Sequence, residues 1–338
     1  MGALEAALAP ILDRRTGQDH PPLFWRHHGQ LASRAGVERT VRECMDNFAL
    51  AGVDPAGKVI LDAGCGFGIS CVLLALMGAR EVHGIDVVES KVETFRRIAS
   101  RLPHLTSLYP KLADVRETGY DPARFDLVLS NEAISHYHEI ESFIEEAWRI
   151  LKPGGMLFIS DGNNGANSGA VRDTQEIWTR FENGPAGPIP KTGHIVEIPY
   201  REQRIRAARA ASPDLSGDEV DTLAANTYGF VAAEVEEAAL AYRRTGVLPA
   251  SRFAPGVPPR SPASGQYIER LIYPGVLARQ LRAAGFTARV YAYLGGAGGN
   301  PFLRAANKLV LSLSPLTWPI GRALKAVARK PPGPGPAA

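Results

Sequence analysis

The sequence of 338 residues lacks any apolar run near the roughly 18 residues that a membrane-spanning helix requires. It contains only three cysteines, Cys44, Cys65 and Cys71, which form no metal-ligand pattern and would leave an odd thiol after pairing. Its first ten residues, MGALEAALAP, have no leading basic residue and do not resemble a secretory signal. These absences favour a reducing compartment, and we expect a cytoplasmic protein.

Acidic residues are absent after Glu269, whereas ten of the 38 basic residues lie beyond that position. The first 269 residues therefore hold 28 basic and 35 acidic groups, a net charge of −7, although the whole chain carries +3. This acidic body argues against a protein that binds nucleic acid along its length. The basic carboxy-terminal part remains able to bind phosphate groups or an anionic membrane.

Apolar segments of strand type alternate with helix-like segments in the first half of the chain. The strand-like segments are KVILDAG, VHGID, LADV, FDLVLS and MLFIS (58–64, 82–86, 112–115, 125–130 and 156–160). The helix-like segments are 69–79, 90–102 and 142–151, the last of which stops at the sequence KPGG. Alternation at this spacing predicts right-handed βαβ units and an α/β fold with a doubly wound, mostly parallel sheet.

The other segments do not follow this alternation, and they divide the chain into five predicted parts. Residues 1–56 form a helical segment before the core at 57–161. Residues 162–268 hold two predicted helices, 170–182 and 217–244, with proline-rich connections; this is too long for a loop and indicates an inserted helical lid. Residues 269–331 return to the sheet through a helix at 274–284 and a strand at 286–294. Residues 332–338 have the composition of a disordered tail.

A glycine-rich loop follows the first predicted strand, in the segment Val59-Ile-Leu-Asp-Ala-Gly-Cys-Gly-Phe-Gly68. Glycines there allow close approach of a ligand to the backbone, and the next helix begins with its positive dipole end. Asp86 follows Gly66 by 20 residues, at the end of the second strand, where doubly wound folds bind the ribose of a nucleoside cofactor. The residues therefore predict an adenosine-containing ligand; a tight turn without a ligand is the alternative.

The details of this loop separate several nucleotide-binding families. A dinucleotide fingerprint requires Gly or Ala at position 69, where Ile69 stands, and no Gly-Lys-Ser/Thr follows as in a P-loop. The segment LDAGCGFG instead resembles motif I of the class I S-adenosylmethionine-dependent methyltransferases. Further segments resemble that family in order: GIDVVE (84–89), LADV (112–115), FDLVLSNEAISHY (125–137), RILKPGGMLFISD (149–161) and, more weakly, VLARQLRAAGF (276–286) and AVARKP (326–331).

This resemblance implies a Rossmann-like sheet of seven strands, with the lid inserted after strand five, and S-adenosyl-L-methionine as cofactor. It implies that Asp62 and the backbone of Gly64, Cys65 and Gly66 hold the methionyl part, while Gly68 permits close helix packing.

The resemblance also places Asp86 and Val87 at the ribose, Asp114 and the Val115 amide at the adenine, and Asn131 at the sulfonium. Asp114 alternatively caps a turn. The amino-terminal segment would act as a flap over the cofactor.

Methyl transfer from a sulfonium depends mainly on positioning, because the leaving group is neutral. A hydroxyl or ammonium acceptor also requires a base, and His136, shortly after strand four, is a candidate base. The alternatives are that His136 only lines the pocket, or that it binds a metal with His138; no third ligand is evident, so we predict no metal site.

The acceptor is expected to be a small molecule, with O-methylation of a sugar-bearing or lipid-linked metabolite favoured by the large lid and by the absence of nucleic-acid-binding features. Methylation of carbon or nitrogen in a natural product or lipophilic metabolite is the first alternative. A non-catalytic S-adenosylmethionine-binding regulatory protein is an alternative of another class.

Residues 301–320 are apolar, contain Arg304 and Lys308, and are interrupted by Pro315 and Pro319, so they cannot span a membrane. Together with the cations up to residue 330, they predict a peripheral contact with the inner face of the membrane, which suits a lipid-linked acceptor. Packing of this segment on the sheet, or a contact between the two chains of a homodimer, is the alternative.

Overall fold

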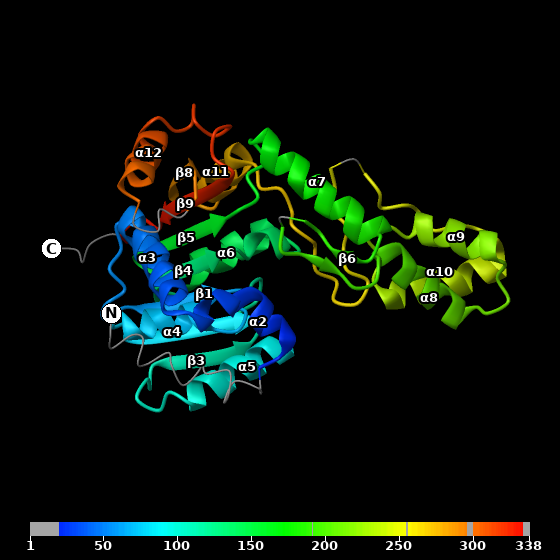
Figure 1. Cartoon of the computed structure of the whole chain (residues 1–338), viewed down its shortest axis with the longest axis horizontal. Helices are drawn as coiled ribbons and strands as arrows, with labels where there is room; N and C mark the ends of the chain where they lie inside the picture. Colours follow the sequence, from blue (N-terminus) through cyan, green and yellow to red (C-terminus); the bar gives the residue numbers. More distant parts are fainter. Residues whose placement is uncertain (1–19, 191, 255, 296–299, 334–338) are drawn as a thin grey trace. The chain divides into compact units, whose positions relative to one another are not determined.

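The computed structural model describes residues 20–190, 192–254, 256–295 and 300–333, and it divides the chain into two compact units. The first unit consists of residues up to Ile134, Glu139–Asn167 and the part from Tyr273 onward; the second consists of Ser135–His138 and Ser168–Ile272. The sequence predictions for residues 1–19 and for most of the tail (334–338) lie outside the described residues. Figure 1 shows the chain with its elements labelled.

The first unit contains a seven-stranded sheet in the order β3-β2-β1-β4-β5-β9-β8. The strands are β1 (Val59–Ala63), β2 (Glu81–Asp86), β3 (Leu108–Leu112), β4 (Phe125–Asn131), β5 (Leu151–Asp161), β8 (Thr287–Tyr293) and β9 (Ala323–Arg329). Strands β1 to β5 pair in parallel, and β9 pairs antiparallel with both β5 and β8. The predicted seven-stranded, mostly parallel, Rossmann-like fold is confirmed.

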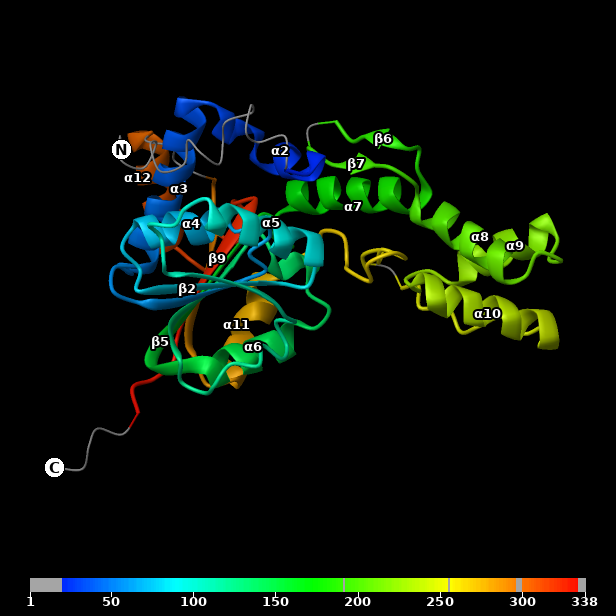
Figure 2. The same ribbon diagram turned by 90° about the horizontal axis from the view of Figure 1, so that it is seen from below.

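Helices cover both faces of this sheet, as Figure 2 shows. The helical elements are α2 (Pro22–His28), η2 (Gly29–Ala32), α3 (Arg34–Ala51), α4 (Ile69–Leu76), α5 (Glu89–Ser100), α6 (Ile140–Ile150), α11 (Pro274–Ala283) and α12 (Pro301–Ser312). Helices α3, α4 and α5 lie on one face, whereas α6 and α11 lie on the other. Because both faces are covered, all five residues of β1 are buried, as expected for a central parallel strand.

The hydrophobic core beneath α3, α4 and α5 joins helix and sheet residues into one cluster. Phe48 of α3, Leu74 of α4 and Phe95 of α5 pack there with Ile60 of β1 and Phe158 of β5. Phe95 and Ile60 are completely inaccessible to solvent, so this packing fixes α4 and α5 firmly against the first two strands. The glycine loop between β1 and α4 is thereby mounted on a rigid base.

The second unit is mainly helical. It contains α7 (Ser168–Asn183), β6 (Gly187–Pro188), β7 (Ile195–Val196), α8 (Tyr200–Ala211), α9 (Gly217–Asn226) and α10 (Ala232–Thr245). Arg204 of α8 is wholly buried, but its guanidinium donates to the Ala224 carbonyl at 3.0 Å and pairs with Glu182. A buried charge persists in a core only when it is paired in this way.

One predicted helix and one predicted strand were wrong, and one helix was missed. The single helix predicted at 217–244 is two helices, because Gly229 adopts a φ of +76° between α9 and α10. Helix α8 was not predicted. The third strand is Leu108–Leu112 rather than 112–115; it lies at the sheet edge, where exposed Tyr109 and Leu112 weaken the expected apolar pattern.

Candidate functional site

The glycine loop is clamped to the end of β2 by its own amide groups. The amides of Gly64 and Cys65 both donate to the Ile85 carbonyl at 2.9 Å, and the Gly66 amide donates to Asp86 Oδ2 at 3.0 Å. All three glycines of the loop have positive φ, between +55° and +79°, which explains why glycine is required there. Because these amides are occupied, the loop offers carbonyl oxygens rather than these N–H groups to a ligand.

Gly66 and Gly68 differ in what surrounds them. A Cβ at Gly68 would lie 2.2 Å from the Phe95 ring, so this glycine permits α5 to pack against the loop. A Cβ at Gly66 would meet nothing within 4 Å, so the backbone there borders open space. The loop therefore has one glycine that serves packing and one whose surface is open to a ligand.

Asp62, at the end of β1, is almost completely buried. Its Oδ2 accepts hydrogen bonds from Ser70 Oγ and, at 3.4 Å, from Cys71 Sγ, both on the first turn of α4. Burial raises the pKa of Asp62, and the two hydrogen bonds act in the opposite direction. This carboxyl group ties the first strand to the start of α4 and so shapes the loop between them.

Asp86, at the end of β2, presents a buried carboxylate that is held by the backbone on both sides. Its Oδ1 accepts from the Val88 amide at 2.9 Å, its Oδ2 accepts from the Gly66 amide, and Lys91 Nζ lies 3.9 Å from Oδ2. Each carboxylate oxygen has two lone pairs, so both retain acceptor capacity beyond these bonds. The geometry suits a pair of vicinal hydroxyls on a ribose.

An apolar surface lies beside this carboxylate. The side chain of Val87 is 48% exposed and that of Leu112 is 43% exposed. The two positions are close because Asp86 pairs with Leu112 in the register of β2 and β3. Exposed aliphatic side chains beside a carboxylate with this geometry would fit the face of a purine ring. Leu112 was not among the predicted site residues, because a single exposed leucine in the sequence gives no signal.

Asp114 and Val115 lie in the loop after β3. Both carboxylate oxygens of Asp114 accept from the guanidinium of Arg116, at 2.9 to 3.2 Å, and Oδ1 also accepts from the Arg116 amide. Both side chains are more than a third exposed, so this pair adds little stability. It fixes the orientation of the Asp114 carboxylate in the loop after β3.

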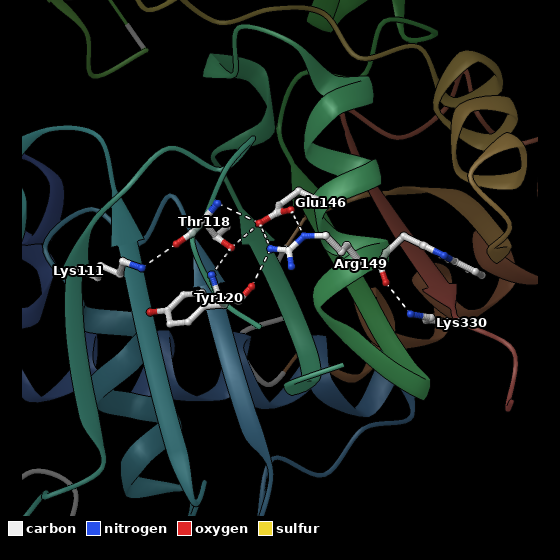
Figure 3. Close-up of polar contacts among 7 residues, drawn as sticks. Lys111, Thr118, Tyr120, Glu146, Arg149 and Lys330 are labelled. Carbon is white, nitrogen blue, oxygen red and sulfur yellow. Dashed lines mark hydrogen bonds and ion pairs between the residues drawn. The ribbon is translucent and has the colours of Figure 1, made fainter. Parts of the chain in front are cut away.

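A polar network anchors the end of this loop to the sheet and to α6, as Figure 3 shows. Glu146 Oε1 accepts from the amide of Thr118 at 2.9 Å and from its hydroxyl at 2.5 Å. Arg149 bonds to Glu146 and also donates to the Tyr120 carbonyl at 2.7 Å, and Lys111 donates to the Thr118 carbonyl at 2.7 Å. Burial favours a higher pKa for Glu146, but these hydrogen bonds outweigh it and lower the pKa. The network fixes the loop that carries Asp114.

Asn131 ends β4 with an exposed side chain, opposite Ser160 of β5 in the sheet register. The next residue, Glu132, has a φ of +50°, and its Oε2 accepts from the Gly162 amide at 3.1 Å. The chain therefore turns sharply directly after Asn131 and is fastened to the end of β5. Asn131 lies at the carboxyl end of the sheet, where Asp86 ends β2 and Asp62 is the last but one residue of β1.

His136 closes the short 3-10 helix η3 (Ile134–His136) and belongs to the second unit. Its Nδ1 lies 3.1 Å from the Tyr267 carbonyl oxygen. A carbonyl only accepts, so Nδ1 must donate, and Nε2 of the neutral ring is left as an acceptor. This is the tautomer that a general base requires. The side chain is partly exposed, and His136 follows Asn131 by five positions.

The amino-terminal helix α2 packs on the glycine loop. Phe24 is wholly buried, and its ring lies 5.4 Å from the Phe67 ring in an edge-to-face arrangement. The His28 ring lies 5.9 Å from the same phenylalanine. This contact places α2 against the glycine loop, where the predicted flap would lie.

The residues at the carboxyl ends of β1 and β2 fit S-adenosylmethionine. The loop has an open backbone surface at Gly66 and a buried carboxylate at Asp86 with acceptor capacity left, and an apolar face lies at Val87 and Leu112. The open backbone would let the ligand approach closely, the carboxylate would accept from its ribose hydroxyls, and the apolar face would suit its adenine. In the described part of the chain, no group of three or more His, Cys, Asp or Glu side chains is placed to hold a metal ion.

None of the helices among the described residues has the length and apolar character needed to span a bilayer.

Known proteins resemble part of this chain. Residues 61–159 match the family model described as a methyltransferase domain. The chain is 32% identical over 144 residues to the mitochondrial ubiquinone biosynthesis O-methyltransferase of Rattus norvegicus, covering 42% of this chain and 40% of that protein. It is 31% identical over 157 residues to the 27-O-demethylrifamycin SV methyltransferase of Amycolatopsis mediterranei, with coverages of 46% and 55%.

A third relative is the ubiquinone biosynthesis O-methyltransferase of Maricaulis maris, 29% identical over 164 residues, which cover 48% of this chain and 61% of that protein. The matched region thus spans between 40% and 61% of the length of these three relatives.

Proposed function

Residues 61–159 form a methyltransferase domain of the class I S-adenosylmethionine-dependent kind, and from this premise we propose that the chain transfers a methyl group from S-adenosylmethionine to an oxygen atom of a small molecule. The family predicted from the sequence, and with it the cofactor that this family uses, is confirmed. The observation that carries the proposal is the end of β2, where Asp86 is buried, fixed by two backbone amides and next to an open glycine backbone.

The cofactor supplies a methyl group on a sulfonium, and the chain supplies the groups that bind and orient it. The Asp86 carboxylate accepts from the ribose hydroxyls, and carbonyl oxygens of the glycine loop accept from the methionyl ammonium. Val87 and Leu112 cover the adenine, and Asp114 accepts from its amino group. Asp62 acts through the loop that it shapes, and Asn131 lines the edge where the sulfonium lies.

Proton removal from a hydroxyl acceptor falls to His136. Its Nδ1–H is committed to the Tyr267 carbonyl, so Nε2 is the atom that accepts the proton. A positioned histidine of this kind accelerates proton transfer by roughly 10²–10⁴-fold. Tyr267 acts through His136, as a positioning residue that fixes the tautomer with its backbone.

The relatives support oxygen as the accepting atom, because two of the three named above are O-methyltransferases by name and the third is named for a 27-O-demethyl substrate. Within that class we favour a sugar-bearing or lipid-linked acceptor, which the long helical second unit and the apolar carboxy-terminal segment suit. Transfer to carbon or nitrogen of a lipophilic metabolite is the second candidate.

The test is methyl transfer from S-adenosylmethionine with a deuterated methyl group to a panel of catechols, phenols, glycosides and polyprenylated phenols. The proposal predicts S-adenosylhomocysteine together with a product whose label is on oxygen. Label on carbon or nitrogen would establish the second candidate. A chain that binds the cofactor but yields no S-adenosylhomocysteine with any acceptor or with a metabolite extract would be a non-catalytic binding protein.

A further inference from the structure

Helix α12 and the turn after it carry a group of large apolar side chains that are open to solvent. We call these residues the apolar platform: Phe302 (84% exposed), Leu309 (60%), Leu313 (48%), Leu316 (84%) and Ile320 (58%). Large apolar side chains at this exposure, gathered within 19 residues of the chain, are typical of an interaction surface rather than of ordinary surface variation.

The platform is a separate face of an amphipathic helix. Phe302 and Leu309 are seven residues apart, which places them on one side of α12, and Leu313 is the C-cap residue of this helix. The opposite side is buried through Val310 and Asn307, whose side chain bonds to Leu294 and Gly295. Packing of this segment on the sheet was the alternative expectation. Only one face of α12 packs on the sheet, and the other face is exposed among the described residues.

The turn after α12 is held in place by hydrogen bonds rather than left loose. Asn164 Nδ2 donates to the carbonyls of Trp318 and Gly321 at 2.8 and 2.6 Å. The Thr317 hydroxyl donates to the Val310 carbonyl at 2.5 Å, and the Trp318 indole donates to the Val290 carbonyl at 2.9 Å. The turn is therefore already ordered, with Leu316 exposed to solvent, whereas the Trp318 indole bonds to the backbone of the fold.

The charges around the platform are positive. Lys308 is exposed one position before Leu309 on α12, and exposed Arg322 follows the turn; Arg279 of α11 is also exposed. Arg304 is paired with Asp46 of α3 at 3.2 Å, the acidic group that the neighbouring helix brings to α12. No acidic residue occurs anywhere after Glu269.

From this arrangement we propose that α12 and its turn dock the protein on an anionic lipid surface, with the apolar platform inserted among the lipid chains and the flanking cations at the headgroups. A rigid apolar face edged by lysine and arginine binds such an interface through both burial and charge. In a symmetric dimer through the same patch, the basic residues of the two copies would face one another, because the sequence after Glu269 contains no acidic residue. The charges therefore favour lipid over a second copy.

This docking is independent of the proposed methyl transfer. Together with that function, docking would bring the enzyme to acceptors that are dissolved in the membrane. The test is flotation of the full chain with vesicles of phosphatidylcholine that contain roughly a quarter phosphatidylglycerol, against pure phosphatidylcholine vesicles. Binding is expected with the anionic vesicles at about 0.05 M salt and is expected to fall several-fold at about 0.5 M.

Matched variants separate the platform from general surface apolarity. The combination Phe302→Ser, Leu309→Ser and Leu316→Ser should lower vesicle affinity by roughly tenfold or more. The control combination Leu240→Ser, Val247→Ser and Phe253→Ser, which alters exposed residues of the second unit, should leave vesicle affinity unchanged. The milder single variant Lys308→Glu should weaken binding mainly at low salt.

Thermal unfolding and S-adenosylhomocysteine binding of each variant report folding and the cofactor site separately from lipid binding. No binding of the folded wild type to anionic vesicles at low salt would overturn the proposal. So would equal losses for the two serine combinations. A wild-type dimer that becomes monomeric in the platform variant, measured by sedimentation, would assign this face to a second copy instead.

Discussion

At the residue scale, Gly66 and Gly68 of the loop make different contributions that substitution can separate. We expect Gly68→Ala to lower the free energy of unfolding by about 2–5 kcal/mol, because its Cβ would meet the Phe95 ring at 2.2 Å on a backbone with a φ of +79°. Gly66→Ala should cost only about 1–2 kcal/mol, since its Cβ points into open space. Urea unfolding measures both changes.

The affinity of each glycine variant for the cofactor product distinguishes a packing role from a binding role. Gly66→Ala should weaken S-adenosylhomocysteine binding more than its small loss of stability explains, because the new methyl group occupies the open side of the loop. Equal stability losses for the two variants would contradict the packing role of Gly68, and unchanged affinity in Gly66→Ala would contradict a ligand at Gly66.

We propose that His136 removes the proton of the acceptor. His136→Ala should lower kcat by roughly 10²–10⁴-fold with little change in cofactor affinity, because the side chain serves the acceptor and not the cofactor. The control His104→Ala alters an exposed histidine of the first unit and should leave kcat unchanged. Steady-state kinetics with an identified acceptor measure both; a variant that retains most of its kcat would show that His136 only lines the pocket.

The sequence indicated those candidate site residues whose environment is formed by residues close to them in the chain. The glycine spacing and Asp86 were recognisable because a strand, a loop and a helix follow one another within thirty residues. The Tyr267 carbonyl that sets the His136 tautomer lies 131 residues away, so nothing near His136 in the sequence points to it. The same holds for Leu112, whose role depends on the register of β2 and β3.

At the scale of elements, the Glu146 network connects α6 to the loop after β3, and its stability effect should depend on pH. Glu146→Gln should lower the free energy of unfolding by about 1–3 kcal/mol at neutral pH, because Arg149 and Thr118 lose a charged acceptor. Glu145→Gln alters the exposed neighbour on the same helix and should have almost no effect.

The direction of the pH effect follows from the lowered pKa of Glu146. A carboxyl group whose pKa is lower in the folded state contributes its full stability above the unfolded pKa, about 4.3, and loses that contribution as the pH falls through the folded value. Urea unfolding of wild type and Glu146→Gln should therefore converge as the pH falls below about 4. A difference that persists unchanged at low pH would show that Glu146 acts through packing and not through its charge.

The helices and strands of the first unit were predicted better from the sequence than those of the second unit. The alternation of strands and helices in the first unit is a local pattern, and it gave the correct fold class. The helix predicted at 217–244 ignored two signals for separate helices, Gly229 and the capping box of Ser216 and Glu219 that begins α9. Helix α8 has many charged residues and a buried arginine, so its apolar pattern is weak.

At the scale of the whole molecule, the ends of β1, β2 and β4 meet at the carboxyl end of the sheet, where the residues that we propose bind the cofactor are located. Asp62, the glycine loop, Asp86 and Asn131 come from different strands, and only the parallel order of those strands brings them to the same edge. The apolar platform lies on α12, an element beside the antiparallel end of the same sheet. The proposed cofactor site and the proposed lipid-docking surface are therefore separate parts of the first unit.

Calorimetric titration of the full chain with S-adenosylhomocysteine tests the central claim, that the carboxyl ends of β1 and β2 bind this cofactor. The wild type should bind, and Asp86→Ala should lose about 1.5–3 kcal/mol of binding free energy, roughly a 10–150-fold loss of affinity. Asp86→Asn, which keeps an acceptor for the loop, serves if the alanine variant fails to fold, and Asp221→Ala on exposed α9 is the unaffected control. No binding by the wild type, or an unchanged affinity in the folded Asp86 variants, would contradict the account.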